Sequence, residues 1–202
     1  MRKLVILNRI TLDGVMQAPS GPEEDASSDF RYGGWAVPLA DEFLGRSYAR
    51  HIDHPFDLLL GRKTYDVFAG YWPFADPQKN PFAAPFKNAT KYVATHRPIE
   101  SNWEKTVRLD GNIAERIRDL KAEDGPELQV YGSSHFIQTL LEHDLVDELW
   151  LKIFPVTLGQ GKRLFAEGTI PAAFELTECA ASPMGVIVAN YRRAGEVKTG
   201  SF

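Results

Sequence analysis

The chain has 202 residues, of which 44% are hydrophobic and 25% charged, and its formal net charge at pH 7 is −4. This length and composition suit one globular domain with a full hydrophobic core. The acidic balance argues against a nucleic-acid-binding protein, which normally has a basic excess. No apolar run approaches the roughly 18 residues of a membrane span, so we expect no membrane segment.

The cysteine count and the N-terminus point to a reducing compartment. Cys179 is the only cysteine, so no disulfide can form within the chain. The first residues, MRKLVILNRI, combine basic and apolar side chains, but no small-residue cleavage site follows. They are more typical of a first strand than of a signal peptide, and we expect a cytoplasmic protein.

Strands and helices alternate over the first 150 residues. Hydrophobic patterning predicts strands over 3–10, 56–61, 90–95, 105–109 and 127–132, and helices over 38–52, 63–72, 112–125 and 133–144. Residues 11–35 form a long loop rich in Gly, Pro and Ser, and residues 73–89 a second loop. A loop as long as the first is usually functional or disordered.

Strands alone follow in the last third of the chain. Residues 146–156 read as one long strand, and 173–182 and 185–194 as an antiparallel hairpin. The whole pattern predicts an α/β domain with a mostly parallel sheet, helices on both faces and an antiparallel C-terminal edge. We expect a single domain over 1–194 and a flexible tail over 195–202.

Ligands in such a sheet bind outside the carboxyl ends of the parallel strands. Glycines follow two of the strands and let the backbone approach a ligand closely. Residues with hydroxyl groups stand at the start of the next helices, where free backbone N–H groups favour phosphate. Two arginines add cations that can fork onto phosphate oxygens. The candidate cofactor residues are Gly61, Arg62, Lys63, Thr64, Thr95, Arg97, Gly132, Ser133 and Ser134.

These turns favour NADPH over NADH, since they carry cations rather than an acid. Any one such turn is common for structural reasons alone. Here, however, four turns that follow strands lie on the same predicted edge of the sheet. His51 and His54 are three residues apart, yet they lack the partners of a complete metal site, and we predict no metal. The sequence also lacks the G-x-S-x-G turn of a hydrolase nucleophile.

Several segments resemble a known family. In order they are ILNRITLDGVM, DLLLGRKTYDVF, KYVATHRP and the stretch from LQVYGSSHF to GQGKRLF. Together they resemble the dihydrofolate-reductase-like fold, most closely the reductase domain of the riboflavin-biosynthesis deaminase–reductase and its stand-alone relatives. The similarity extends from residue 3 to about 192. It implies NADPH, a small cyclic or sugar-like substrate such as a pterin or a pyrimidine–ribitol compound, and a homodimer.

The resemblance also implies residue roles. The turn at Gly61 would lie on the adenosine and pyrophosphate side, Thr95 and Arg97 near the 2′-phosphate, and Gly132 beneath the pyrophosphate. Asp13, in the motif TLDG, would lie by the nicotinamide. Leu7 departs from the pattern, because riboflavin reductases usually have a lysine six residues before that Asp.

The leading hypothesis is therefore an NADPH-dependent reductase whose substrate the sequence does not identify. Asp13 is the first candidate for polarising or protonating the substrate and Asp41 the second, while Asp13 has the alternative role of a turn residue before Gly14. The aromatic residues Phe30, Tyr32 and Trp35 would wall a flat substrate or, alternatively, anchor the loop. A non-catalytic nucleotide-binding or regulatory protein that keeps the fold is the alternative function.

Overall fold

A computed structural model describes residues 1–167 and 169–201 of the chain. The strands are β1 (Leu4–Thr11), β2 (Phe56–Gly61), β3 (Lys91–Ala94), β4 (Thr106–Leu109), β5 (Glu127–Val130), β6 (Glu148–Phe154), β7 (Phe174–Ala181) and β8 (Ile187–Arg193). The α-helices are α1 (Glu42–Ala49), α2 (Arg62–Ala69), α3 (Ala83–Asn88), α4 (Ile113–Ala122) and α5 (Ser134–Glu142). Short 3-10 turns η1, η2 and η3 cover Ser27–Asp29, Val37–Leu39 and Trp72–Phe74.

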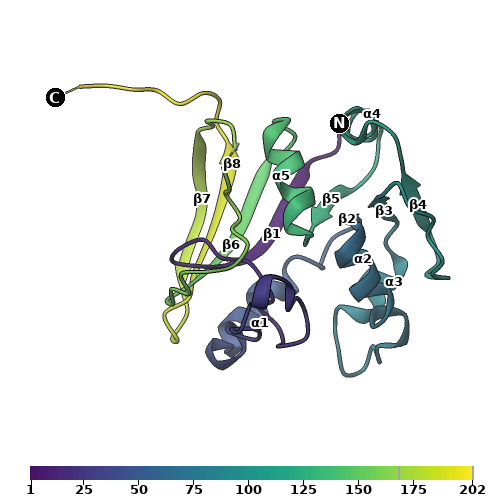
Figure 1. Ribbon diagram of the computed structural model, residues 1–202, viewed down its shortest axis with the longest axis horizontal. Helices are drawn as coiled ribbons and strands as arrows, with labels where there is room; N and C mark the ends of the chain where they lie inside the picture. The colour runs from purple at the N-terminus through teal and green to yellow at the C-terminus, as the bar shows by residue number, and fades with distance from the viewer. Residues whose placement is uncertain (168, 202) are drawn as a thin grey trace.

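The strands form one sheet in the order β4-β3-β2-β5-β1-β6-β8-β7 (Figure 1). Every pair from β4 to β6 is parallel, whereas β8 runs antiparallel to both β6 and β7. The predicted fold class is confirmed, including the closing hairpin at the C-terminal edge. The parallel strands all end at one edge of the sheet, which is where a ligand is expected.

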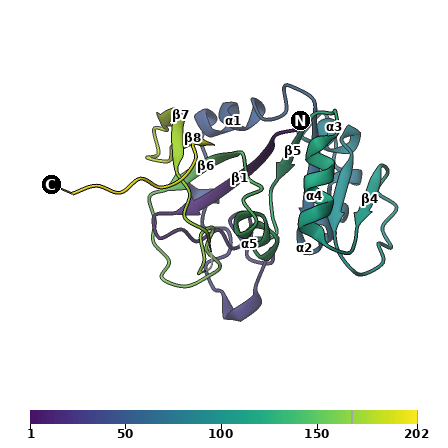
Figure 2. The ribbon, with the colours of Figure 1, turned by 90° about the horizontal axis from the view of Figure 1, so that it is seen from above.

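Helices cover both faces of the sheet because the buried strands are apolar on both faces. In β2, Leu59 packs with residues of α4 and α5, while Leu58 and Leu60 pack on the opposite face with α2 and α3. The third core cluster joins Leu44 of α1 to Phe154 of β6. Viewed from above, α1 and α5 lie on opposite sides of the sheet (Figure 2). This double coverage is typical of parallel sheets.

Most predicted elements lie within a few residues of their observed ends, but residues 73–89 differ from the predicted loop. This segment contains α3, whose Phe86 is only 1% exposed. The Phe86 ring contacts Trp72 and Phe68 with centroid separations of 4.6 and 5.7 Å. Pro85 lies in the first turn of the helix, where its missing N–H costs no hydrogen bond. Tertiary packing of an aromatic cluster therefore supports a helix that the local composition does not indicate.

Ala194 and Gly195 still exchange backbone hydrogen bonds with Ala173, and residues 196–201 then run away from the body of the molecule (Figure 1). The boundary between a domain over 1–194 and a tail over 195–202 stays a prediction. Over 1–167 and 169–201, no helix has both the length and the apolar character needed to cross a membrane.

Candidate functional site

The short strand β5 opens a cleft in the middle of the sheet. Its last residue, Val130, pairs with Ile6, whereas β1 continues beside β6 as far as Thr11. On the other side, β2 continues beside β3 as far as Gly61. The two halves of the sheet therefore separate beyond Val130, at the carboxyl ends of the strands, which is the expected place for a ligand.

A cavity of about 190 Å³ fills this cleft. One wall comes from α2 and the turn after β5, and it contains Lys63, Thr64 and 131–134. The opposite wall comes from β1, β6 and α1, and part of the long loop closes the remaining side. The residues of these other walls are Leu7, Asn8, Arg9, Met16, Gln17, Ala18, Pro19, Ser20, Glu24, Asp25, Tyr48, His51, Lys152 and Lys162.

Two glycines bring the turns after β2 and β5 into contact. A Cβ added at Gly132 would lie 2.5 Å from Thr64 Oγ1, and one added at Gly61 would collide with Ser133. The amide of Gly61 donates to the carbonyl of Gly132 at 3.1 Å. Ser133 is the N-cap of α5, yet its side chain makes no capping hydrogen bond. Bare backbone and an uncapped helix N-terminus thus face the cavity, as a phosphate cradle requires.

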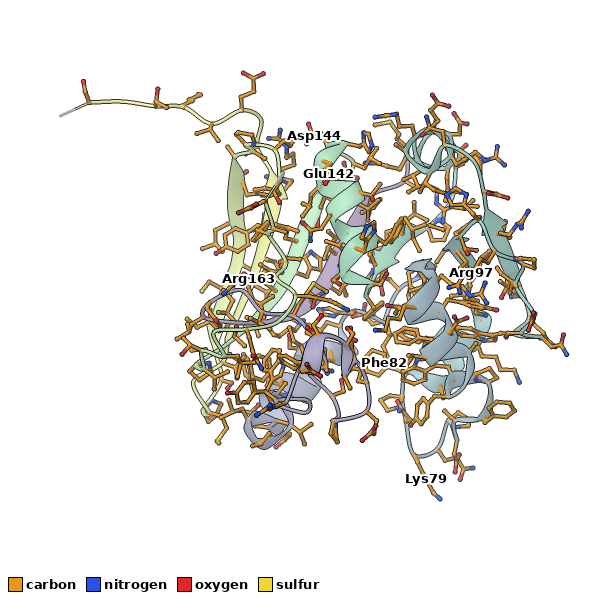
Figure 3. The ribbon with its side chains drawn as sticks, viewed as in Figure 1. Lys79, Phe82, Arg97, Glu142, Asp144 and Arg163 are labelled. Carbon is orange, nitrogen blue, oxygen red and sulfur yellow. The ribbon has the colours of Figure 1, made fainter. Side chains whose placement is uncertain are left out.

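The two arginines predicted to bind phosphate lie beyond the cavity wall. Arg62 pairs with Asp66 at 2.7 Å and donates to the carbonyl of Pro98. Thr95 Oγ1 accepts from the amide of Arg97 at 3.1 Å, so it shapes the turn after β3. Arg97 is exposed, and Figure 3 shows it on the sheet's β3 side near α2. These residues form a separate basic turn next to the cavity wall that α2 contributes.

The long loop is fastened across the cavity by Asp25. Its carboxylate binds Lys63 of α2 at 2.5 Å and Lys162 at 2.6 Å, and Ser27 also donates to it. Burial opposes ionisation, but hydrogen bonds from Lys162 and Lys63 outweigh burial and lower the pKa of Asp25. Lys63, a predicted cofactor residue, is therefore held by a carboxylate from the loop.

Asp13 does not line the cavity and makes the contacts of a turn residue. Its carboxylate accepts from Thr11 Oγ1 at 2.5 Å and from the amides of Leu158 and Gly159. The Thr11 hydrogen bond is the main cause of the lowered pKa of Asp13, and the two amides add to it while partial burial opposes it. Asp13 thus joins the turn after β1 to the segment after β6.

The other catalytic candidate, Asp41, also lies outside the cavity lining. It is the N-cap of α1 and accepts from the amide of Leu44 at 2.8 Å. This hydrogen bond to Leu44 is the first cause of the lowered pKa of Asp41.

The three aromatic candidates are loop anchors in this structure. Trp35 donates from Nε1 to the carbonyl of Gln17 at 2.8 Å and packs edge-on against Phe154. Phe30 is 7% exposed and lines a separate small hollow, and Tyr32 is half-exposed beside it. None of them lies in the lining of the central cavity.

Two cations in the cavity lining, Arg9 of β1 and Lys152 of β6, were not among the residues predicted from the sequence; their side of the cavity is called the cavity floor below. Lys152 of β6 is 1% exposed and lies opposite Arg9 in the parallel register. Its Nζ is 2.9 Å from Nε2 of His51 and 4.7 Å from the centre of the Tyr48 ring. A charge inside an otherwise apolar strand was the available signal, because lysine is rarely buried without a partner.

The two histidines considered for metal binding have other partners. His51 contacts Lys152, while His54 pairs with Asp53 at 2.8 Å and with Glu127 at 3.0 Å. In the described part of the chain, no group of three or more His, Cys, Asp or Glu residues could hold a metal ion.

Comparison with known proteins identifies the family. The family model for the RibD C-terminal domain matches residues 2–188, and the chain belongs to this family. It is 27% identical over 168 residues to the uncharacterised protein YyaP of Bacillus subtilis (strain 168), covering 82% of this chain and 81% of that protein.

Solved structures show the same fold. A putative riboflavin biosynthesis protein from Shewanella sp. PV-4 is similar with a TM-score of 0.69 and 20% identity, covering 95% of this chain and 99% of that one. Dihydrofolate reductase from Enterococcus faecalis, solved with NADP(H), gives a TM-score of 0.59 and 16% identity, covering 95% and 96%. The family and its neighbours establish a reductase-like fold.

Proposed function

We propose that the protein is an NADPH-dependent reductase that acts on a small cyclic or sugar-like substrate. The observation that carries this proposal is the cavity where β5 ends. The two glycine turns form a phosphate-type cradle on one wall, and polar side chains of β1, β6 and α1 line the opposite wall. Membership of the RibD C-terminal domain family supports it, as does the NADP(H) bound to the similar dihydrofolate reductase.

The residues present fit such a cofactor. Gly61 and Gly132 keep the two turns free of side chains, and the N-termini of α2 and α5 supply amide donors and a positive dipole. Lys63 and Lys162 add positive charge, shared with the carboxylate of Asp25. A bound NADPH supplies the hydride for the reduction. The chain's own residues hold its phosphates, orient the substrate and exclude water from the cavity.

A direct test measures NADPH and NADH binding by calorimetry and then NADPH oxidation with pterins, pyrimidine–ribitol phosphates and quinones. Gly132→Ala should abolish NADPH binding, since the new Cβ would meet Thr64 within the cradle. Gly45→Ala is the matched control, because a Cβ there meets nothing within 4 Å and alanine favours a helix. Lys63→Gln, at a half-exposed site, should weaken NADPH binding even if Gly132→Ala does not fold. Wild-type protein that binds neither cofactor would overturn the proposal.

One observation favours a second function, a non-catalytic nucleotide-binding or regulatory protein. Neither Asp13 nor Asp41 reaches the cavity, so neither carboxylate is placed to serve as an acid for a substrate there. In this case NADPH would bind with normal affinity, while no member of the substrate panel would be reduced.

A further inference from the structure

Two cations in the central cavity lack a carboxylate partner. Arg9 and Lys152 both line the cavity, and neither forms an ion pair with an Asp or Glu in the described 1–167 and 169–201. The cavity's other two cations, Lys63 and Lys162, share Asp25. A buried charge without a partner is costly, so this half of the cavity favours an anionic ligand.

One N–H donor of the Lys152 ammonium group is left for a ligand. The ammonium group carries three N–H donors, and the contacts account for one at His51 Nε2 and one toward the Tyr48 ring. An ammonium can only donate, so when Lys152 is charged Nε2 is the acceptor and His51 is neutral. Burial, and secondarily the nearby Lys152 charge, hold the pKa of His51 well below its usual range. His51 therefore orients the ammonium without cancelling its charge.

Arg9 is held in place by neutral groups. Its Nε donates to Tyr48 Oη at 2.6 Å and its Nη1 to Ser20 Oγ at 2.7 Å. These two hydrogen bonds fix the orientation of the guanidinium beside Lys152. Asn8, also in the cavity lining, has a buried Nδ2 with no hydrogen-bond partner in the part of the chain that the structure describes. Fixed, unused donors of this kind lower the cost of ordering a ligand.

The surrounding walls suit a flat ring. Aromatic and apolar side chains of the cavity lining are Leu7, Met16, Tyr48, Val67, Phe68 and Tyr131. We propose that Arg9, Lys152 and His51 form an anion-binding subsite, and that the substrate is a planar ring compound that presents a carboxylate or a negatively charged ring oxygen to Lys152. This inference concerns the substrate half of the proposed reductase site and rests on that function.

Lys152 makes anion binding depend on pH in the neutral range. Burial and, secondarily, the charges of Arg9 and Arg50 together lower the pKa of Lys152 to about 7, while Glu178 opposes them. The groups that face it are Arg9 from β1, Tyr48, Arg50 and His51 from α1 and its C-terminal end, and Glu178 from β7. Lys152 is an ammonium below that pKa and a neutral amine above it, so an anion should bind best on the acidic side.

The test uses benzoate as the anion and benzamide as its neutral counterpart, with calorimetry between pH 6 and 9, without nicotinamide cofactor. Benzoate stays ionised throughout this range, since carboxyl groups titrate near pH 4. We expect benzoate to bind and benzamide to bind at least tenfold more weakly. Benzoate affinity should fall as pH rises through about 7. Equal binding of the two probes, or a benzoate affinity that is flat with pH, would overturn the proposal even if no variant folds.

Two lysine variants test whether Lys152 causes the benzoate binding and its pH dependence. Lys152→Met keeps the length of the side chain and removes the charge, and it should weaken benzoate binding at least tenfold and abolish its pH dependence, since a charge-assisted hydrogen bond is lost. Lys79→Met is the control, because its side chain is 86% exposed in a loop far from the sheet (Figure 3). Unchanged benzoate binding in Lys152→Met would refute the subsite. NADPH binding, measured separately, tests the cofactor half, so the two proposals can fail independently.

Discussion

Replacing Asp13 by Asn distinguishes a catalytic residue from a turn residue. The carboxylate, 21% exposed, accepts hydrogen bonds from Thr11, Leu158 and Gly159. Asparagine has the same shape but only one acceptor oxygen, and its NH2 group would face at least one amide donor. Because a hydrogen bond to a charged group contributes about 1.5–3 kcal/mol, we expect a loss of about 2 kcal/mol in the free energy of unfolding.

This loss should appear as a lower melting temperature. In a domain of this size, 1 kcal/mol shifts Tm by about 2–4 °C, so Asp13→Asn should melt roughly 4–8 °C below the wild type in circular dichroism. NADPH affinity should change little, since Asp13 lies outside the cavity lining. Asp119→Asn, on the exposed face of α4, is the control and should leave Tm unchanged.

The pH dependence gives an independent check. The pKa of Asp13 is lowered in the folded protein, chiefly by the Thr11 hydroxyl. Its stabilising contribution is therefore present above its unfolded pKa of 3.8 and is lost as pH falls through the folded value. The stability gap between the wild type and Asp13→Asn should shrink below about pH 4. An unchanged Tm together with a turnover about 100-fold lower would refute the turn role and make Asp13 an acid–base residue.

The basic turn after β3 should make NADPH bind about tenfold or more tightly than NADH, because each charge-assisted contact to the 2′-phosphate contributes about 1.5–3 kcal/mol. Arg97→Gln should remove more of this preference than Arg62→Gln, because the Arg62 side chain already pairs with Asp66. Equal affinities of the wild type for NADPH and NADH in calorimetry would contradict the predicted preference. Asp25→Asn should raise NADPH affinity a few-fold by releasing Lys63, and titration of the variant at pH 7 checks this. We propose a homodimer through the exposed edge strand β7, so light scattering should show a dimer that Leu176→Lys dissociates.

The features that could be predicted from the sequence are those encoded locally. Asn112 caps α4 by accepting from the amide of Glu115, and an asparagine before an amphipathic run is a local signal of a helix start. Gly61 ends β2 and Gly132 lies two residues beyond β5, and a glycine in such a place is informative without knowing which strands are neighbours. Helix α3 was missed because its support comes from distant aromatic rings around Phe86, and a local pattern does not contain them.

The polar floor of the cavity was harder to find because it depends on strand register. Arg9 and Lys152 are 143 positions apart in the chain and meet only because β1 and β6 pair in parallel with these two residues opposite each other. A shift of one residue in either strand would turn that side chain to the opposite face of the sheet.

The two walls of the cavity therefore differ in how far the local sequence predicts them. On the wall formed by α2 and the turn after β5, the glycines Gly61 and Gly132 leave backbone exposed at two turns, and a glycine at a strand end can be recognised from the local sequence. The opposite wall is made of side chains that converge from β1, β6 and α1. Leu7 of β1 and Lys152 of β6 both line this wall, so its charge depends on which side chain each strand carries there. Lys152 is therefore the residue of this wall at which the effect of a single charge on ligand binding should be measured first.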